Sequence, residues 1–174
     1  MRILLLVLIT FFVIVNVAVE FLRKDLHPKT DPMSSYLTGR YGELVDASYL
    51  ALGGAIGTLP LYLGAGMHFA VICWISTAAV FAVVLTKRLR EDAPPSLQVE
   101  LLHLHVLAAG IAFVSASILL LMHGWHDQFQ FLIGAAAPAS AALFARFKPN
   151  ATAIEEKTYA SLVLVGLIAL VLSP

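Results

Sequence analysis

Charged residues and cysteines are both scarce in this chain of 174 residues. Only 13% of the residues are charged and 60% are hydrophobic, whereas a soluble domain usually carries about a quarter of charged residues. The single cysteine, Cys73, cannot form an internal disulfide, and a metal site built from several cysteines is excluded. The 11 basic residues balance the 11 acidic ones, so the charge does not indicate a nucleic-acid partner.

Several common catalytic motifs are also missing from the sequence. It contains no Gly-rich phosphate loop, no nucleophile elbow, no HExxH and no paired CxxC. The sequence therefore names no cofactor, and we assign no metal-ligating residue.

Long apolar runs dominate what is present. A helix needs about 20 mostly apolar residues to cross the hydrocarbon core of a bilayer. Six runs of this kind occur, at 3–22, 44–63, 68–86, 97–122, 129–147 and 154–172. The sequence predicts an all-α, polytopic membrane protein: a bundle of six transmembrane helices that forms a single domain over residues 1–174.

The basic residues predict the orientation of this bundle. Every lysine and arginine except Arg2 lies in or beside the first, third and fifth connections between the six runs. Short loops that are rich in lysine and arginine stay in the cytoplasm. We therefore expect these connections to face the cytoplasm and both termini to lie on the non-cytoplasmic side.

Polar residues collect at the predicted cytoplasmic face. They come from the first connection, the start of the second helix and the start of the fourth. Polar groups near lipid are energetically costly, so these residues are candidates for a functional site. We expect a cytoplasm-facing polar cavity with these ligand-binding residues: Asp31, Ser34, Tyr36, Arg40, Tyr41 and His105. Arg40 would hold a phosphate or carboxylate, because the guanidinium fork matches both groups.

The residues leave several functions open. The first is binding of a lipid or small amphiphile. The second is an intramembrane lipid hydrolase with a metal-activated water or with Ser34, His105 and Asp92 as catalytic candidates. The third is a non-catalytic subunit of a larger membrane complex. Membrane lipids are the expected partners, and other membrane subunits or further copies of the chain are the alternatives.

A simpler interpretation gives the polar residues no ligand at all. They would solvate the helix ends and pair with the basic residues, as Glu20 would with Arg23 or Lys24.

Two stretches resemble a known family. "HPKTDPMSSYLTGRYGELVDASYLALGGA" holds a Pro-x-Ser-x-Tyr element followed by Gly-x-Tyr-Gly, and "REDAPPSLQVELLHLHVLAAGIAF" has an acidic residue before a turn and then a histidine that opens an Ala-rich span. In both, the chain is similar to the bacterial multi-spanning membrane family catalogued as domain of unknown function 998. The resemblance implies a multi-pass protein of the bacterial inner (cytoplasmic) membrane and carries no established activity.

Overall fold

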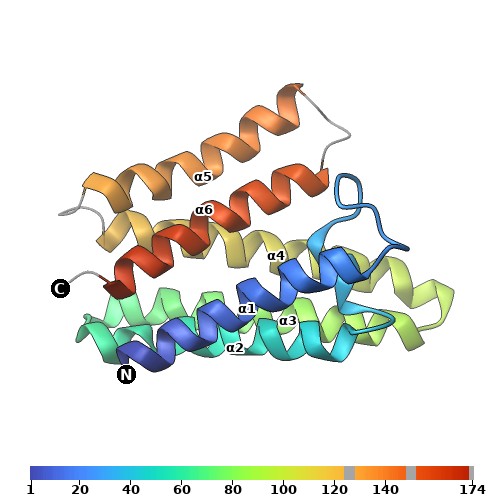
Figure 1. Ribbon diagram of the computed structural model, residues 1–174, viewed down its shortest axis with the longest axis horizontal. Helices are drawn as coiled ribbons and strands as arrows, with labels where there is room; N and C mark the ends of the chain where they lie inside the picture. The colour runs from blue at the N-terminus through green and yellow to red at the C-terminus, as the bar shows by residue number, and fades with distance from the viewer. Residues whose placement is uncertain (124–127, 148–151, 173–174) are drawn as a thin grey trace.

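The chain is all-helical in the parts that the structure, a computed structural model, describes: residues 1–123, 128–147 and 152–172 (Figure 1). These residues form six α-helices and one short 3-10 helix, η1. The elements are α1 (Arg2–Leu22), η1 (Met33–Leu37), α2 (Gly42–Leu63), α3 (Met67–Asp92), α4 (Pro95–His123), α5 (Gln128–Phe147) and α6 (Thr152–Leu172). The prediction of an all-α chain with six helices is confirmed, although α3 continues past residue 86 and includes Asp92.

Four of the described helices, α1 to α4, are long and apolar enough to cross a membrane. They contain 21, 22, 26 and 29 residues, so each is about 30 Å long or longer at a rise of 1.5 Å per residue. Large apolar side chains also point outward from them, such as Ile3 and Phe21 on α1 and Leu61 on α2. An outer surface of this kind fits a lipid environment better than water.

The helices alternate in direction, and five of them form a ring. Consecutive helices from α1 to α4 pack side by side, and α6 closes the ring by packing against both α1 and α4 (Figure 1). Arg2 at the start of α1 donates a hydrogen bond of 2.7 Å to the carbonyl of Leu172 at the end of α6. In the described part of the chain, α5 packs on the outside of this ring against α4 and α6.

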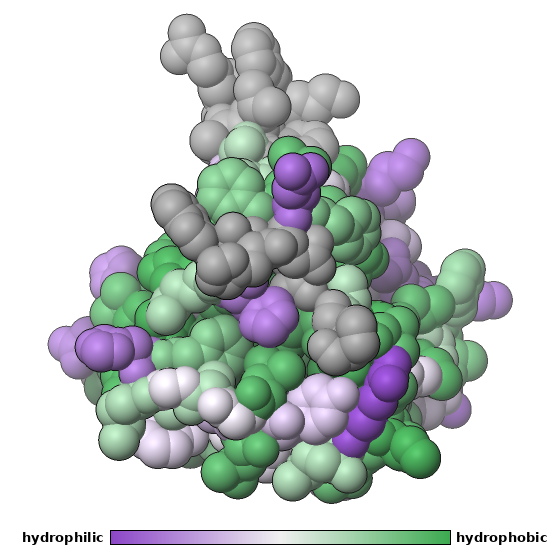
Figure 2. Space-filling view, turned by 90° about the vertical axis from the view of Figure 1, so that its left-hand side faces the viewer, coloured by the Kyte–Doolittle hydropathy of each residue, from purple (hydrophilic) through white to green (hydrophobic). Residues whose placement is uncertain are grey.

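The two ends of the bundle are formed by different segments. The first connection and the turn between α3 and α4 lie at one end, and α1 begins at the other (Figure 1). Figure 2 views the end at which α1 begins, where hydrophobic residues extend to the edge and hydrophilic residues are scattered among them. The basic residues of the first and third connections therefore share the end opposite to the one in Figure 2.

The first connection belongs to the core of the bundle. Tyr36 and Leu37 of η1 are 3% and 0% exposed, and they pack in a cluster with Val19 of α1, Val45 of α2 and Val83 of α3. The segment between α1 and α2 therefore forms a folded cap over one end of the ring.

Arg23 fixes the far end of this cap. Its buried guanidinium donates to the carbonyl of Thr38 at 2.6 Å and to that of Arg40 at 3.2 Å, and it donates to the Asp25 carboxylate at 2.7 Å and 2.8 Å. The hydrogen bonds from Arg23 hold the pKa of Asp25 below its usual value. One side chain thus ties the end of α1 to the backbone that leads into α2.

The entry into α2 requires glycine at one position. Gly39 has a φ of 71°, and Tyr41, directly before α2, adopts a similar left-handed conformation. A Cβ atom on Gly42 would lie 2.5 Å from the carbonyl oxygen of Leu37. Because the obstacle is backbone of the cap, any larger residue at position 42 would force the cap and the start of α2 apart.

We expect Gly42→Ala to destabilise the protein by about 1–3 kcal/mol, the usual cost of overpacking, and to lower the Tm of the detergent-solubilised protein by several degrees. Gly54→Ala is the matched control. Gly54 lies in the same helix, and a Cβ atom there would have no neighbouring atom within 4 Å. Equal Tm values for the two variants would contradict the close approach of the cap to α2.

Candidate functional site

A cavity of about 600 Å³ lies inside the ring. Its walls come from α1, α2, α3, α4 and α6, and residues 32–35 of the cap cover one of its ends. Sites for small molecules in proteins usually have volumes of about 300–1,000 Å³. The cavity is therefore large enough for a small-molecule ligand.

One face of α3 runs along the whole cavity. Ser76, Val80, Val83, Lys87 and Arg90 line it and are three or four residues apart, the spacing of one helix face. From Ser76 to Arg90 this face is about 21 Å long. The cavity is thus an elongated channel parallel to the helices.

Small residues on α4 leave the room for this channel. Ala109, Gly110 and Ala112 line the channel from α4, next to α3, where larger side chains would close it. On α2, Leu52 and Ile56 add apolar surface to the wall.

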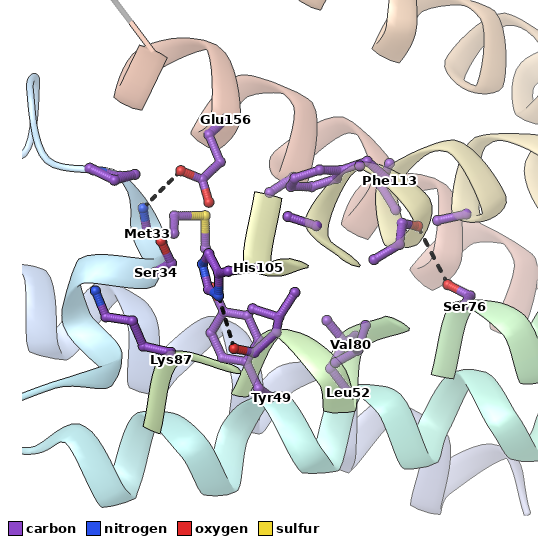
Figure 3. A pocket seen from close by; sticks show the side chains of 18 of the residues that line it. Met33, Ser34, Tyr49, Leu52, Ser76, Val80, Lys87, His105, Phe113 and Glu156 are labelled. Atoms are coloured by element: carbon purple, nitrogen blue, oxygen red, sulfur yellow. Dashed lines mark hydrogen bonds between the residues drawn. The ribbon is translucent and has the colours of Figure 1, made fainter. Parts of the chain in front are cut away.

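The polar groups of the channel gather at the capped end. Figure 3 shows Ser34, Lys87, His105 and Glu156 close to one another there, whereas Leu52, Val80 and Phe113 lie further along the channel. The channel is thus polar at one end and apolar along its length, which is the pattern of an amphiphile.

The His105 ring is held in one tautomer. Its Nδ1 atom lies 3.1 Å from the carbonyl oxygen of Val83 and 3.1 Å from the hydroxyl of Thr86. The Val83 carbonyl can only accept, so Nδ1 carries the hydrogen, and the Thr86 hydroxyl donates to the carbonyl of Ala82 at 2.6 Å. In the neutral ring Nε2 is then a bare acceptor, with no protein partner in the described part of the chain.

The start of α6 holds the cap at two points. The Glu156 carboxylate accepts a hydrogen bond of 3.0 Å from the backbone N–H of Met33 (Figure 3). Next to it, the Lys157 ammonium donates to the carbonyl of Pro28 at 2.6 Å and pairs with Glu20 of α1 at 3.0 Å. These bonds keep the cap over the polar end of the channel.

Tyr36 lies beside this second contact, outside the channel. The Lys157 ammonium is 5.4 Å from the centroid of its ring, and its hydroxyl is buried without a hydrogen-bond partner in the part of the chain that the structure describes. Burial raises the pKa of Tyr36 above its usual value. The phenol therefore remains neutral and acts here as part of the core.

The structure brings two of the predicted site residues together. Ser34 from the cap and His105 from α4 line the same channel, although they are far apart in the sequence. Both are at its polar end (Figure 3).

The other predicted residues lie outside the lining of this channel. Asp31 accepts a hydrogen bond from the backbone N–H of His27 and closes a turn of the first connection. The Arg40 guanidinium stacks over the ring of Tyr41, 4.9 Å from its centroid, and Asp92 is exposed at the end of α3.

Sequence reasoning missed three charged residues of the lining: Lys87, Arg90 and Glu156. Lys87 and Arg90 were used only to predict the orientation of the bundle. Their spacing nevertheless places them on the same helix face as Val83. For Glu156 the signal was a carboxylate at the start of an apolar run, where a polar group needs a partner.

The part of the chain that the structure describes holds no group of three or more His, Cys, Asp or Glu residues that could bind a metal ion.

No protein-family model, no curated protein and no solved structure matches the chain. The resemblance in the two sequence stretches therefore stays a prediction, and the function must be argued from the channel itself.

We expect Glu156→Ala to loosen the cap, because the Met33 N–H loses its acceptor. A hydrogen bond to a charged group contributes about 1.5–3 kcal/mol, so amide hydrogen exchange over residues 33–35 should become about tenfold faster or more. Glu156→Gln, which keeps an acceptor oxygen, should give a smaller increase, and Glu155→Ala on the same turn should leave the exchange unchanged. Equal rates in all three variants would show that Glu156 does not hold the cap.

Proposed function

We propose that this chain is an integral membrane protein that binds a lipid or small amphiphile in the channel. The observation that carries the proposal is the separation of polar and apolar groups along the channel. A headgroup would lie beside His105 and the cap, and an acyl chain would follow the apolar face of α3 toward Ser76. Burial of the acyl chain against this wall would supply most of the affinity, at about 0.8 kcal/mol for each methylene.

We further propose that all six helices cross the bilayer. α5 and α6 contain 20 and 21 residues, which is enough for a span, and the charged residues of α6 lie in its first turns, where they would reach the interface. With the basic end of the bundle in the cytoplasm, both termini lie outside and the headgroup lies at the level of the inner leaflet. The resemblance to a bacterial family supports the inner membrane as the location.

An acyl chain would enter this channel from the bilayer. Leu102 and Val106 of α4 line the channel and are also 41% and 61% exposed. At this position in a membrane protein such side chains contact lipid, so the wall formed by α4 is the natural place of entry.

The geometry supports binding better than hydrolysis. Ser34 and His105 share the channel, but Asp92 does not line it, and a backbone carbonyl occupies the His105 nitrogen that a triad carboxylate would hold. The hydrolase and the subunit role both stay predictions.

We expect Ala109→Phe to fill the channel and remove the amphiphile. Native mass spectrometry of the protein released from detergent should show a bound lipid-sized adduct in the wild type and at least about fivefold less of it in the variant, since overpacking costs about 1–3 kcal/mol. Ala135→Phe is the control, because Ala135 is exposed on α5 and lines no wall of the channel. Equal adduct in the two variants would refute binding in the channel.

We expect cysteine labelling in intact cells to give the proposed topology. In a Cys73→Ala background, single cysteines in place of Lys29 and Glu91 should react only after the membrane is made permeable. A cysteine in place of Gly66, between α2 and α3, should react with an impermeant maleimide without that treatment. Labelling of positions 29 and 91 from opposite sides would rule out this arrangement.

A further inference from the structure

The charges that line the channel are unequal. Two cations, Lys87 and Arg90, face one carboxylate, Glu156, among the described lining residues. The only other titratable side chains of this lining are those of His105 and Tyr49, and neither adds a negative charge near pH 7. The polar end therefore carries an excess of positive charge.

The two cations also lack the partners that other cations of the molecule have. Arg23 pairs with Asp25, Arg88 with Asp46, and Lys157 with Glu20. Lys87 and Arg90 are half-buried, and neither makes an ion pair in the described part of the chain. A partly buried charge is unfavourable unless it is paired, so this end of the channel favours an anion.

Glu156 does not fill that role. Its carboxylate accepts the N–H of Met33 and so holds the cap. No ion pair joins it to Lys87 or Arg90 among the described residues, so its charge leaves the two cations available.

We propose that the amphiphile has an anionic headgroup, a carboxylate or a phosphate, and that Lys87 and Arg90 bind it. This inference rests on the proposed function, since it names the chemical class of the ligand in the same channel. The two residues are three apart on one face of α3 and so lie one above the other. Arginine can bind such an anion through two parallel hydrogen bonds, and lysine adds a compact charge beside it.

Lys87 and Arg90 therefore replace Arg40 as the residues proposed to bind the anionic headgroup. Arg40, the residue that the sequence suggests for an anionic headgroup, stacks on Tyr41 outside the lining. Ser34 and Ser35 of the cap border the polar end of the channel and offer hydroxyl donors to the same headgroup. The acyl chain then continues past Val83 and Val80.

Binding of single-chain probes tests the proposal. The full-length protein in phosphatidylcholine nanodiscs is titrated with radiolabelled palmitate, lysophosphatidic acid or uncharged monopalmitoylglycerol. Palmitate or lysophosphatidic acid should bind about tenfold more tightly than the uncharged probe, because hydrogen bonds to charged groups contribute about 1.5–3 kcal/mol. A preference for palmitate would indicate a carboxylate ligand, and a preference for lysophosphatidic acid a phosphate ligand.

Variants distinguish the contribution of the headgroup to binding from that of the apolar channel. Lys87→Gln and Arg90→Gln should each weaken the preferred anion about tenfold and leave monopalmitoylglycerol unchanged. Lys24→Gln, which removes an exposed charge of the first connection, should leave all three probes unchanged. An equal loss of anion binding in the Lys24 variant would mean that the general charge of this end attracts the probe, and it would overturn the assignment.

Failure of the inference differs from failure of the proposed function. If all three probes bind equally, compete with one another and are lost in Ala109→Phe, the channel binds amphiphiles but does not select an anion, and the inference is wrong. If no probe binds, or if Ala109→Phe binds every probe like the wild type, the proposed function fails and the inference fails with it.

Discussion

The buried guanidinium of Arg23 is the interaction on which the polar end of the molecule depends. It binds the two carbonyls of Thr38 and Arg40 while Asp25 neutralises its charge. Through this contact the backbone that leads into α2 is tied to the end of α1. The packing of Leu37 against Val19 and the bond from Met33 to Glu156 then complete the hold on the cap and on Ser34.

The proposed membrane environment explains how a ring of helices can keep a channel between them. Lipid provides little hydrophobic drive between helices, so they associate through close packing and polar contacts. Here polar contacts join helices at both ends, Arg2 with Leu172 at one and Lys157 with Glu20 at the other. Others lie further inside the bundle, such as the hydrogen bond between Ser117 of α4 and Tyr159 of α6. Between the two ends, α4 presents small residues toward α3, and the space that they leave is the channel.

The sequence alone was sufficient to predict the six helices, but it was not sufficient to predict which charged side chains pair with one another. Apolar runs defined all six helices, because the need to satisfy backbone hydrogen bonds in lipid leaves few other structures. The pairing of Glu20 with Arg23 or Lys24 was wrong: Glu20 pairs with Lys157, far away in the sequence, and Arg23 pairs with Asp25. Such contacts depend on how α1 and α6 are juxtaposed, which no local pattern specifies.

Glu156 and Lys157 are neighbours on α6, and their side chains point about 100° apart around its axis. One holds Met33 at the rim of the channel and the other holds Pro28 and Glu20 on the side of α1. A small rotation of α6 would therefore break both contacts together. The position of the cap over the polar end of the channel is thus coupled to the rotation of one helix.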